Sequence, residues 1–136
     1  MRSISLPDHR QEKPQRVVIV ADDDDAVCFV LREVLTFAGW RVIQIRDGGE
    51  IWPILEREAD CAILLDLNMP GVNGWEVLRR LRNEPELARR RSEFWVVVIS
   101  GQSDRASRDF ALSLGADDFL AKPINLDALH AALQFR

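Results

Sequence analysis

The chain has 136 residues, of which 47% are hydrophobic and 29% are charged, and its formal net charge is −4. This length and this balance fit one globular domain with a packed core, and they exclude a disordered or fibrous chain. The acidic charge also argues against direct binding of nucleic acid, because that affinity depends on many Lys and Arg contacts with phosphates.

The N-terminal residues and the two cysteines indicate the cellular compartment in which we expect the protein. Residues 1–15 are polar, predict a flexible N-terminal tail, and lack the apolar core of a signal peptide. No apolar run is long enough to cross a bilayer, so we expect no association with a membrane. Cys28 and Cys61 lie in apolar segments without a CxxC pair or a His cluster. We therefore expect two buried, reduced thiols and a cytoplasmic protein.

Five short apolar runs alternate with segments of helical period along the rest of the chain. The apolar runs predict strands over 17–20, 42–45, 62–65, 95–99 and 119–121. The periodic segments predict helices over about 27–35, 51–55, 75–82, 110–114 and 126–133. Nearly continuous apolar strands are typical of a parallel sheet that is covered on both faces. The sequence thus predicts an α/β fold, a (βα)5 doubly wound parallel five-stranded sheet with helices on both faces.

Several polar residues outside these runs are expected at the surface. One of the aspartates at 22–24 is expected to cap the first helix, and Ser103 the fourth. The positions expected to be solvated are Arg79, Arg80 and Arg82 on the third helix, Arg89–Arg91 in a loop, and Asp117 and Asp118 in a turn.

Polar residues follow four of the predicted strands, at the point where each strand ends. Four aspartates, Asp22 to Asp25, follow the first strand, and Asp66 ends the third. Ser100 follows the fourth strand, and Lys122 with Pro123 follows the fifth. Because the carboxyl ends of parallel strands lie at one edge of the sheet, these side chains are expected to form one site.

The residue types of this predicted site indicate its chemistry. Close carboxylates repel one another unless a cation compensates their charge, and Mg²⁺ is the abundant divalent cation that prefers oxygen ligands. A lysine and a hydroxyl beside the cation would stabilise charge on phosphoryl oxygens. A carboxylate can itself be the nucleophile and form an aspartyl phosphate.

At these positions the sequence resembles the receiver domains of response regulators, over about residues 16–135. The matching positions are the acidic pair Asp22 and Asp23, the phosphoacceptor segment Leu65–Gly71 with Asn73 and Gly74, Ser100 with Gly101, the aromatic Phe119, and Lys122 with Pro123. The resemblance implies a receiver domain over 16–136 with the flavodoxin-like strand order 2-1-3-4-5.

The resemblance also implies a role for each matching residue. Asp66 would accept the phosphoryl group, and Ser100 and Lys122 would hold its oxygens. Mg²⁺, with Mn²⁺ as a substitute, would be bound by Asp23, Asp66 and the backbone carbonyl of Asn68, with Asp22 acting mostly through water. Gly101 would leave the attacking path open. Pro123 would follow a cis peptide bond.

The function implied is that of a phosphoacceptor in a two-component phosphorelay. A histidine kinase or a phosphotransfer protein would donate the phosphoryl group in a Mg²⁺-dependent reaction. Ser100 and Phe119 would then switch the surface of the fourth helix, fifth strand and fifth helix, which would meet a downstream protein, an output domain or a second copy of the chain. The protein would not be an enzyme beyond catalysing its own phosphorylation and dephosphorylation.

Two alternatives from other classes remain open at this point. Asp23-x-Asp25-x-Val27 fits the first motif of haloacid-dehalogenase-like phosphatases, although the other motifs follow in the wrong order. The second alternative is a degenerate receiver domain that acts as an interaction module independently of phosphorylation. No motif position is missing, so the sequence itself does not favour this alternative.

Overall fold

The computed structural model describes residues 15–102 and 104–134. Its five strands are parallel and form one sheet in the order β2-β1-β3-β4-β5. The strands are β1 (Val17–Ala21), β2 (Arg41–Ile45), β3 (Cys61–Asp66), β4 (Phe94–Ser100) and β5 (Asp118–Ala121). The fold class and the strand order are confirmed, and each predicted strand end lies within one residue of the observed end. The predicted tail over 1–15 falls almost entirely outside the described residues.

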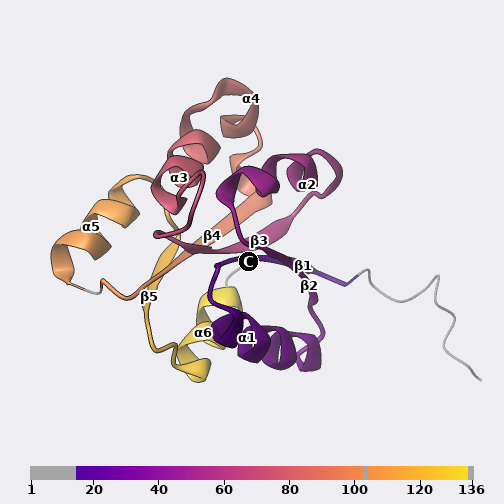
Figure 1. Cartoon of the computed structure of the whole chain (residues 1–136). Helices are drawn as coiled ribbons and strands as arrows, with labels where there is room; N and C mark the ends of the chain where they lie inside the picture. The colour runs from indigo at the N-terminus through magenta and orange to yellow at the C-terminus, as the bar shows by residue number, and fades with distance from the viewer. Residues whose placement is uncertain (1–14, 103, 135–136) are drawn as a thin grey trace, which may run out of the picture.

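Six α-helices surround the sheet in the described part of the chain (Figure 1). They are α1 (Asp25–Phe37), α2 (Ile51–Arg57), α3 (Gly74–Asn83), α4 (Pro85–Ala88), α5 (Arg105–Ser113) and α6 (Leu126–Gln134). The sequence did not predict α4, a single turn that begins with a proline at its first position, where the missing N–H costs nothing. The predicted fourth and fifth helices are therefore α5 and α6.

The helices cover the sheet in two layers, as Figure 1 shows. Buried residues of α2, α3 and α5 pack on one face, together with Ile19, Ile63 and Phe119 of the strands. Buried residues of α1 and α6 pack on the other face, with Val18 and Leu64. Successive strand residues point to opposite faces, and because both faces are covered, the central strands β1, β3 and β4 are apolar along almost their whole length. No helix within residues 15–102 and 104–134 has the length and apolarity needed to span a bilayer.

Side chains of the loops begin several of the helices. Asp24 caps α1 by accepting hydrogen bonds from the backbone N–H groups of Ala26 and Val27, as expected for one of the aspartates. Asp104 caps α5 through the backbone N–H of Ser107. Ser103, which we expected to cap α5, lies outside the described residues.

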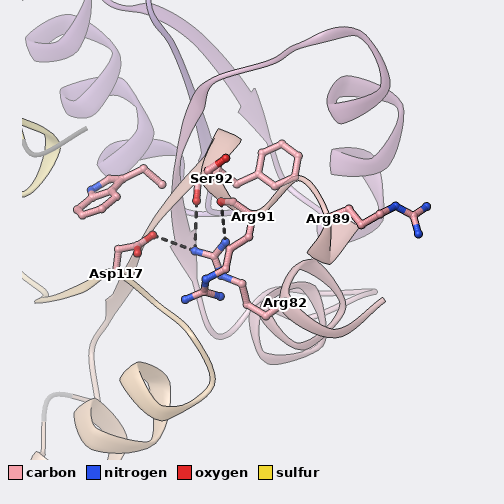
Figure 2. A pocket seen from close by; sticks show the side chains of 7 residues that line it. Arg82, Arg89, Arg91, Ser92 and Asp117 are labelled. Atoms are coloured by element: carbon pink, nitrogen blue, oxygen red, sulfur yellow. Dashed lines mark hydrogen bonds and ion pairs between the residues drawn. The ribbon is translucent and has the colours of Figure 1, made fainter. Parts of the chain in front are cut away.

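The prediction that Arg82 and Asp117 are solvated is wrong. The Arg82 side chain is 4% exposed, and its guanidinium donates to Asp117 Oδ2 at 2.9 Å and to three backbone carbonyls (Figure 2). Asp117 also accepts from the backbone N–H of Val96 at 2.8 Å. Asp118 is likewise not in a turn, since it begins β5. The end of α3 is thus joined to the start of β4 and to the turn before β5.

Arg90 also differs from the predicted solvated loop. Its guanidinium donates to the carbonyls of Leu55 and Glu58, pairs with Glu93, and lies over the ring of Phe94. Arg89 remains exposed. The arginine run therefore serves in part to hold the end of α2 against the start of β4.

Candidate functional site

The carboxyl edge of the sheet brings the predicted site residues together. Asp66 is the last residue of β3, and Ser100 is the last residue of β4. Asp22 directly follows β1, and Lys122 directly follows β5. The backbone N–H of Lys122 donates to the carbonyl of Ser100 at 2.9 Å, which fixes the end of β5 beside that of β4.

Three carboxylates form an acidic cluster at this edge. One oxygen from each of Asp22, Asp23 and Asp66 lies within 4.8 Å of the other two. Asp22 is fully buried and Asp66 is 4% exposed, whereas Asp23 is exposed. Backbone amides orient the two buried carboxylates: Asp24 N donates to Asp22 Oδ1 at 2.9 Å, and Asn68 N donates to Asp66 Oδ1 at 3.1 Å. The cluster concentrates negative charge in a small, partly dry volume.

Lys122 supplies the positive charge that faces the cluster. Its Nζ atom lies 2.8 Å from Asp22 Oδ2 and 3.3 Å from Asp66 Oδ2. The contact with Asp22 is an ion pair rather than a well-directed hydrogen bond, because Oδ2 of Asp22 accepts no hydrogen bond of regular geometry from the described residues. One ammonium group therefore serves two buried carboxylates, and the buried oxygen of Asp22 retains capacity for another donor or a cation.

Burial and neighbouring charges shift the pKa values of Asp66 and Lys122. Burial raises the pKa of Asp66, and the charge of Asp22 raises it further, against the opposing effects of the Asn68 amide and Lys122. For Lys122, burial lowers the pKa, but Asp22 and Asp66 together outweigh burial, so the pKa is raised. Lys122 therefore stays charged at neutral pH, while the charge on Asp66 carries a cost.

The donor set fits a hard divalent cation. Three carboxylates at one site suit Mg²⁺ or Ca²⁺, which take oxygen ligands, and among them Oδ2 of Asp22 accepts no hydrogen bond from the described residues. Asn68 follows two residues after Asp66 and is exposed at the same edge. A cation here would offset both the burial of the Asp66 carboxylate and the charge of Asp22, which raise the pKa of Asp66.

The remaining predicted residues differ in their surroundings. Ser100 is fully buried, and its Oγ accepts from the backbone N–H of Gln102 at 3.0 Å. A Cβ atom at Gly101 would meet nothing within 4 Å, so the space above this residue is open. Phe119 is 5% exposed and packs with residues of α5. The peptide bond between Lys122 and Pro123 is cis, as the resemblance implied.

The structure explains the fourth aspartate, Asp25. Its side chain pairs with Arg46, which directly follows β2, and is 73% exposed. It does not join the acidic cluster of Asp22, Asp23 and Asp66. A haloacid-dehalogenase-like site needs both aspartates of its first motif at the reacting group, so this arrangement does not favour that alternative.

A hollow of about 580 Å³ lies at the other edge of the sheet, around Arg82 and Asp117 (Figure 2). It borders the amino ends of β4 and β5 and is lined by none of the predicted site residues. We therefore place the candidate site at the carboxyl edge.

Fold and site together define a doubly wound α/β domain with an acidic, lysine-containing site at the carboxyl edge of its sheet. The response regulator receiver domain family matches residues 18–134. The chain belongs to this family, whose members act in two-component signalling.

Individual relatives agree with this assignment. The response regulator MprA of Mycolicibacterium vanbaalenii is 34% identical over 121 residues, which cover 89% of this chain and 49% of MprA. A putative response regulator from Chloroflexus aurantiacus is 27% identical, with a TM-score of 0.78 over 90% of this chain and 97% of that one. A response regulator from Burkholderia pseudomallei, solved with a phosphorylated aspartic acid, a calcium ion and citrate, is 27% identical, with a TM-score of 0.74 over 88% of this chain and 67% of that one.

The chain spans about half the length of curated relatives that it matches, 43% for the response regulator GtcR of Aneurinibacillus migulanus and 49% for MprA. The match therefore covers the receiver part of those proteins.

Sequence reasoning missed the segment around Asp47, which contacts the loop after Asp66. Asp47 and Glu50 form a capping box at the start of the short turn Gly48–Glu50. The Asp-Gly-Gly-Glu sequence carries this signal, since an aspartate followed three residues later by a glutamate is typical of a helix start. The contact with the loop carries no such signal.

Proposed function

We propose that this receiver domain accepts a phosphoryl group on Asp66 from a phosphohistidine of a histidine kinase or a phosphotransfer protein. The single observation that carries the proposal is the acidic cluster with Lys122 between its two buried carboxylates, at the edge where Ser100 and Asp66 end neighbouring strands. The solved relative with a phosphorylated aspartic acid and a calcium ion supports the same chemistry.

A carboxylate oxygen of Asp66 attacks phosphorus in line with the leaving imidazole. A phosphorus–oxygen bond forms as the phosphorus–nitrogen bond breaks, and the electron pair of that bond stays with the imidazole. Lys122 turns its ammonium group from its ion pair with Asp22 and its hydrogen bond with Asp66 toward the new phosphoryl oxygens. Ser100 lies at the end of the neighbouring strand and offers its hydroxyl to a second oxygen, and the open space above Gly101 admits the donor.

Mg²⁺ is the cation that we propose for the site, with Asp22, Asp23, Asp66 and the backbone carbonyl of Asn68 as its protein ligands, Asp22 mostly through water. When bound, it supplies charge that offsets the negative charge on the transferring oxygens. Mn²⁺ would substitute because it accepts the same oxygen ligands. The residues held at the edge then need little rearrangement, since backbone amides already orient Asp22 and Asp66.

The phosphoryl group would bias an equilibrium between two states of α5, β5 and α6. Phe119 is already buried, so in this proposal phosphorylation stabilises the inward position of Phe119 while Ser100 leaves Gln102 for the phosphoryl group. The altered surface would bind a downstream protein, an output domain or a second copy. The domain would perform no chemistry on other substrates. A cytoplasmic location is part of the proposal and rests on the two free, buried thiols.

The test is incubation with Mg²⁺ and acetyl phosphate, followed by measurement of acid-labile protein phosphate. We expect label on the wild type and none on Asp66→Asn or in the absence of Mg²⁺. Phosphate release that survives Asp66→Asn but is lost in Asp23→Asn would instead identify a phosphatase. Partner binding without any label or release would identify the phosphorylation-independent interaction module.

A further inference from the structure

The loop between β3 and α3 is fastened at its tip to a segment that is distant in the sequence. Val72 lies in this loop, and both of its backbone groups are bonded to residues that follow β2. Its N–H donates to Asp47 Oδ1 at 3.2 Å, across 25 positions of the sequence. Its carbonyl accepts from Gly48 N at 2.9 Å. A loop residue with both backbone groups bonded in this way has little freedom to shift.

Two glycines allow the close approach of these segments. A Cβ atom at Gly48 would lie 2.1 Å from the carbonyl oxygen of Val72. A Cβ atom at Gly71 would lie 1.8 Å from Asp47 Oδ2, and Gly71 has a φ of +69°, which disfavours other residues. The fit between Asp47 and the loop therefore leaves no room for a side chain at either position.

Asp47 is also fixed by hydrogen bonds within its own turn, independently of the loop. Its Oδ1 accepts from Gly49 N at 2.7 Å, and its backbone N–H donates to Glu50 Oε1 at 3.0 Å. These bonds form the capping box of the short turn that leads into α2. Asp47 does not belong to the acidic cluster. The carboxylate is thus a fixed acceptor on the scaffold, with one oxygen shared between its own turn and the loop.

The same loop is anchored at its base next to the phosphoacceptor. Gly74 N donates to the carbonyl of Leu67 at 3.2 Å, and a Cβ atom at Gly74 would lie 2.1 Å from the carbonyl oxygen of Asp66. Between this base and the tip at Val72 lies Asn68, whose carbonyl is the proposed ligand for the cation. The part of the loop that carries Asn68 is therefore held on both sides.

We propose that Asp47 is a positioning residue for cation binding, which holds the loop after Asp66 so that the carbonyl of Asn68 is in place before the cation arrives. This inference rests on the proposed function. Mg²⁺ and Mn²⁺ need close octahedral geometry, so a ligand on an unfastened loop must be ordered at the expense of affinity. Loss of a residue that orients a metal ligand typically weakens metal binding about 10- to 100-fold.

The experiment compares three substitutions of Asp47 with a matched control. Asp47→Ala removes the acceptor, and Asp47→Asn keeps an oxygen that accepts from Val72 and Gly49. Asp47→Ser keeps a cap for the turn but is one bond shorter, so it preserves folding should the alanine variant fail to fold. Asp104→Ala removes an equivalent aspartate cap, that of α5, whose side chain accepts from Ser107 N within its own helix.

Three quantities are measured on the full chain: the Kd for Mn²⁺ alone by electron paramagnetic resonance, the hydrogen exchange of the Val72 amide, and the free energy of unfolding. We expect Asp47→Ala and Asp47→Ser to raise the Kd by about 10-fold and to speed exchange at Val72. The Kd of Asp47→Asn should stay within about 3-fold of the wild-type Kd, because the amide oxygen of asparagine can still accept the hydrogen bond from Val72 N. Asp104→Ala should lose stability with an unchanged Kd.

The outcomes separate this inference from the proposed function. Wild-type binding of Mn²⁺ with a Kd that Asp47→Ala and Asp47→Ser leave unchanged overturns the positioning role alone. A Kd that rises equally in Asp104→Ala also overturns it, since the effect would then follow from stability. Absence of Mn²⁺ binding and of phosphorylation in the wild type overturns the proposed function and the inference with it.

Discussion

The ammonium group of Lys122 lies 2.8 Å from a carboxylate oxygen of Asp22, a residue with no exposed surface. The same ammonium is 3.3 Å from Asp66. One positive charge thus faces two buried negative charges, and a third carboxylate, that of Asp23, lies within reach of the same cation site. The site therefore holds an excess of negative charge whenever no cation is bound, and this excess has consequences for stability.

We predict that Asp66→Asn stabilises the metal-free protein at neutral pH. The pKa of Asp66 is raised above its ordinary value of 3.8, first by burial and then by Asp22. Between the unfolded and the folded pKa, the native state binds more protons than the unfolded state, so stability falls as pH rises through that window and stays lower above it. The asparagine variant lacks this cost.

Urea unfolding at several pH values without Mg²⁺ measures the difference. The advantage of Asp66→Asn should be present at pH 7 and vanish below pH 3.8. Asp104→Asn is the control of opposite sign, because backbone and side-chain hydrogen bonds from Ser107 lower the pKa of Asp104, so its loss should destabilise the protein at neutral pH. An Asp66→Asn variant that is less stable at pH 7 would contradict the prediction.

The second prediction concerns Arg82, which joins three elements at the opposite edge of the sheet. Arg82→Ala removes the nearly buried guanidinium that pairs with Asp117 and donates to three carbonyls, so it should destabilise the protein by about 3 kcal/mol. Arg79→Ala is the matched control on the same helix. Its pair with Glu76 is exposed and screened by solvent, so its loss should destabilise the protein far less than the loss of Arg82. Equal losses from the two variants in urea unfolding would show that Arg82 contributes no more than a surface pair.

The errors at Arg82 and Asp117 show where sequence reasoning ends. The central strands β1, β3 and β4 were predictable because they are apolar runs buried almost throughout, and the parallel order of the sheet placed Asp22, Asp66 and Lys122 at one edge. Arg82 follows Leu81, the last apolar residue of the α3 stripe, and as a charged residue beside Arg79 and Arg80 it was expected on the solvated side of the helix. Its burial depends on hydrogen bonds to carbonyls of β4 and of the α5–β5 turn. These partners are distant in the sequence, so the helical periodicity of α3 cannot predict them.

The contact between Asp47 and Val72 could not be predicted from the sequence for a related reason. The capping box of Asp47 and Glu50 is local and has a sequence pattern, but its partner lies 25 positions away in a loop. The glycines that permit the contact, Gly48 and Gly71, look like ordinary turn residues in the sequence. Only the packing of the β2–α2 segment against the loop gives them a common role.

The third prediction is that the Cys28 thiol is inert and makes stability depend on alkaline pH. Burial, with the charge of Asp22, raises the pKa of Cys28 from 9.0 to about 11. Between these values the unfolded thiol loses its proton while the folded thiol keeps it, so stability falls as pH rises from 9 toward 11. The chain contains no tyrosine, which leaves few other groups to titrate in this window.

Cys28→Ser is the comparison, because the hydroxyl keeps a donor for the carbonyl of Asp22 that the thiol now contacts at 3.2 Å. Urea unfolding of both proteins at pH 8 and pH 10.5 should show a smaller loss for the serine variant. At pH 8 the native wild type should also react with a thiol reagent no faster than it unfolds. Rapid labelling of Cys28 in the folded state would show that the thiol is neither buried nor protonated as described.

The last prediction uses Trp75 to observe the proposed switch. Trp75 follows Gly74, which packs on the backbone of Asp66, and its ring contacts Phe110 of α5 with centroids 5.0 Å apart. Movement of α5 would change this contact, whereas Trp95 has no ring contact with the described residues of α5 and donates to the Ala132 carbonyl of α6. Mg²⁺ with beryllofluoride, a mimic of the phosphoryl group, should therefore change tryptophan emission. The change should disappear in Trp75→Phe and in Asp66→Asn. If the emission change persists in Trp75→Phe, another tryptophan causes it, and it does not report the contact between Trp75 and α5. If the wild type binds beryllofluoride without a change in emission, Trp75 and Phe110 keep their contact, and the switch does not involve it.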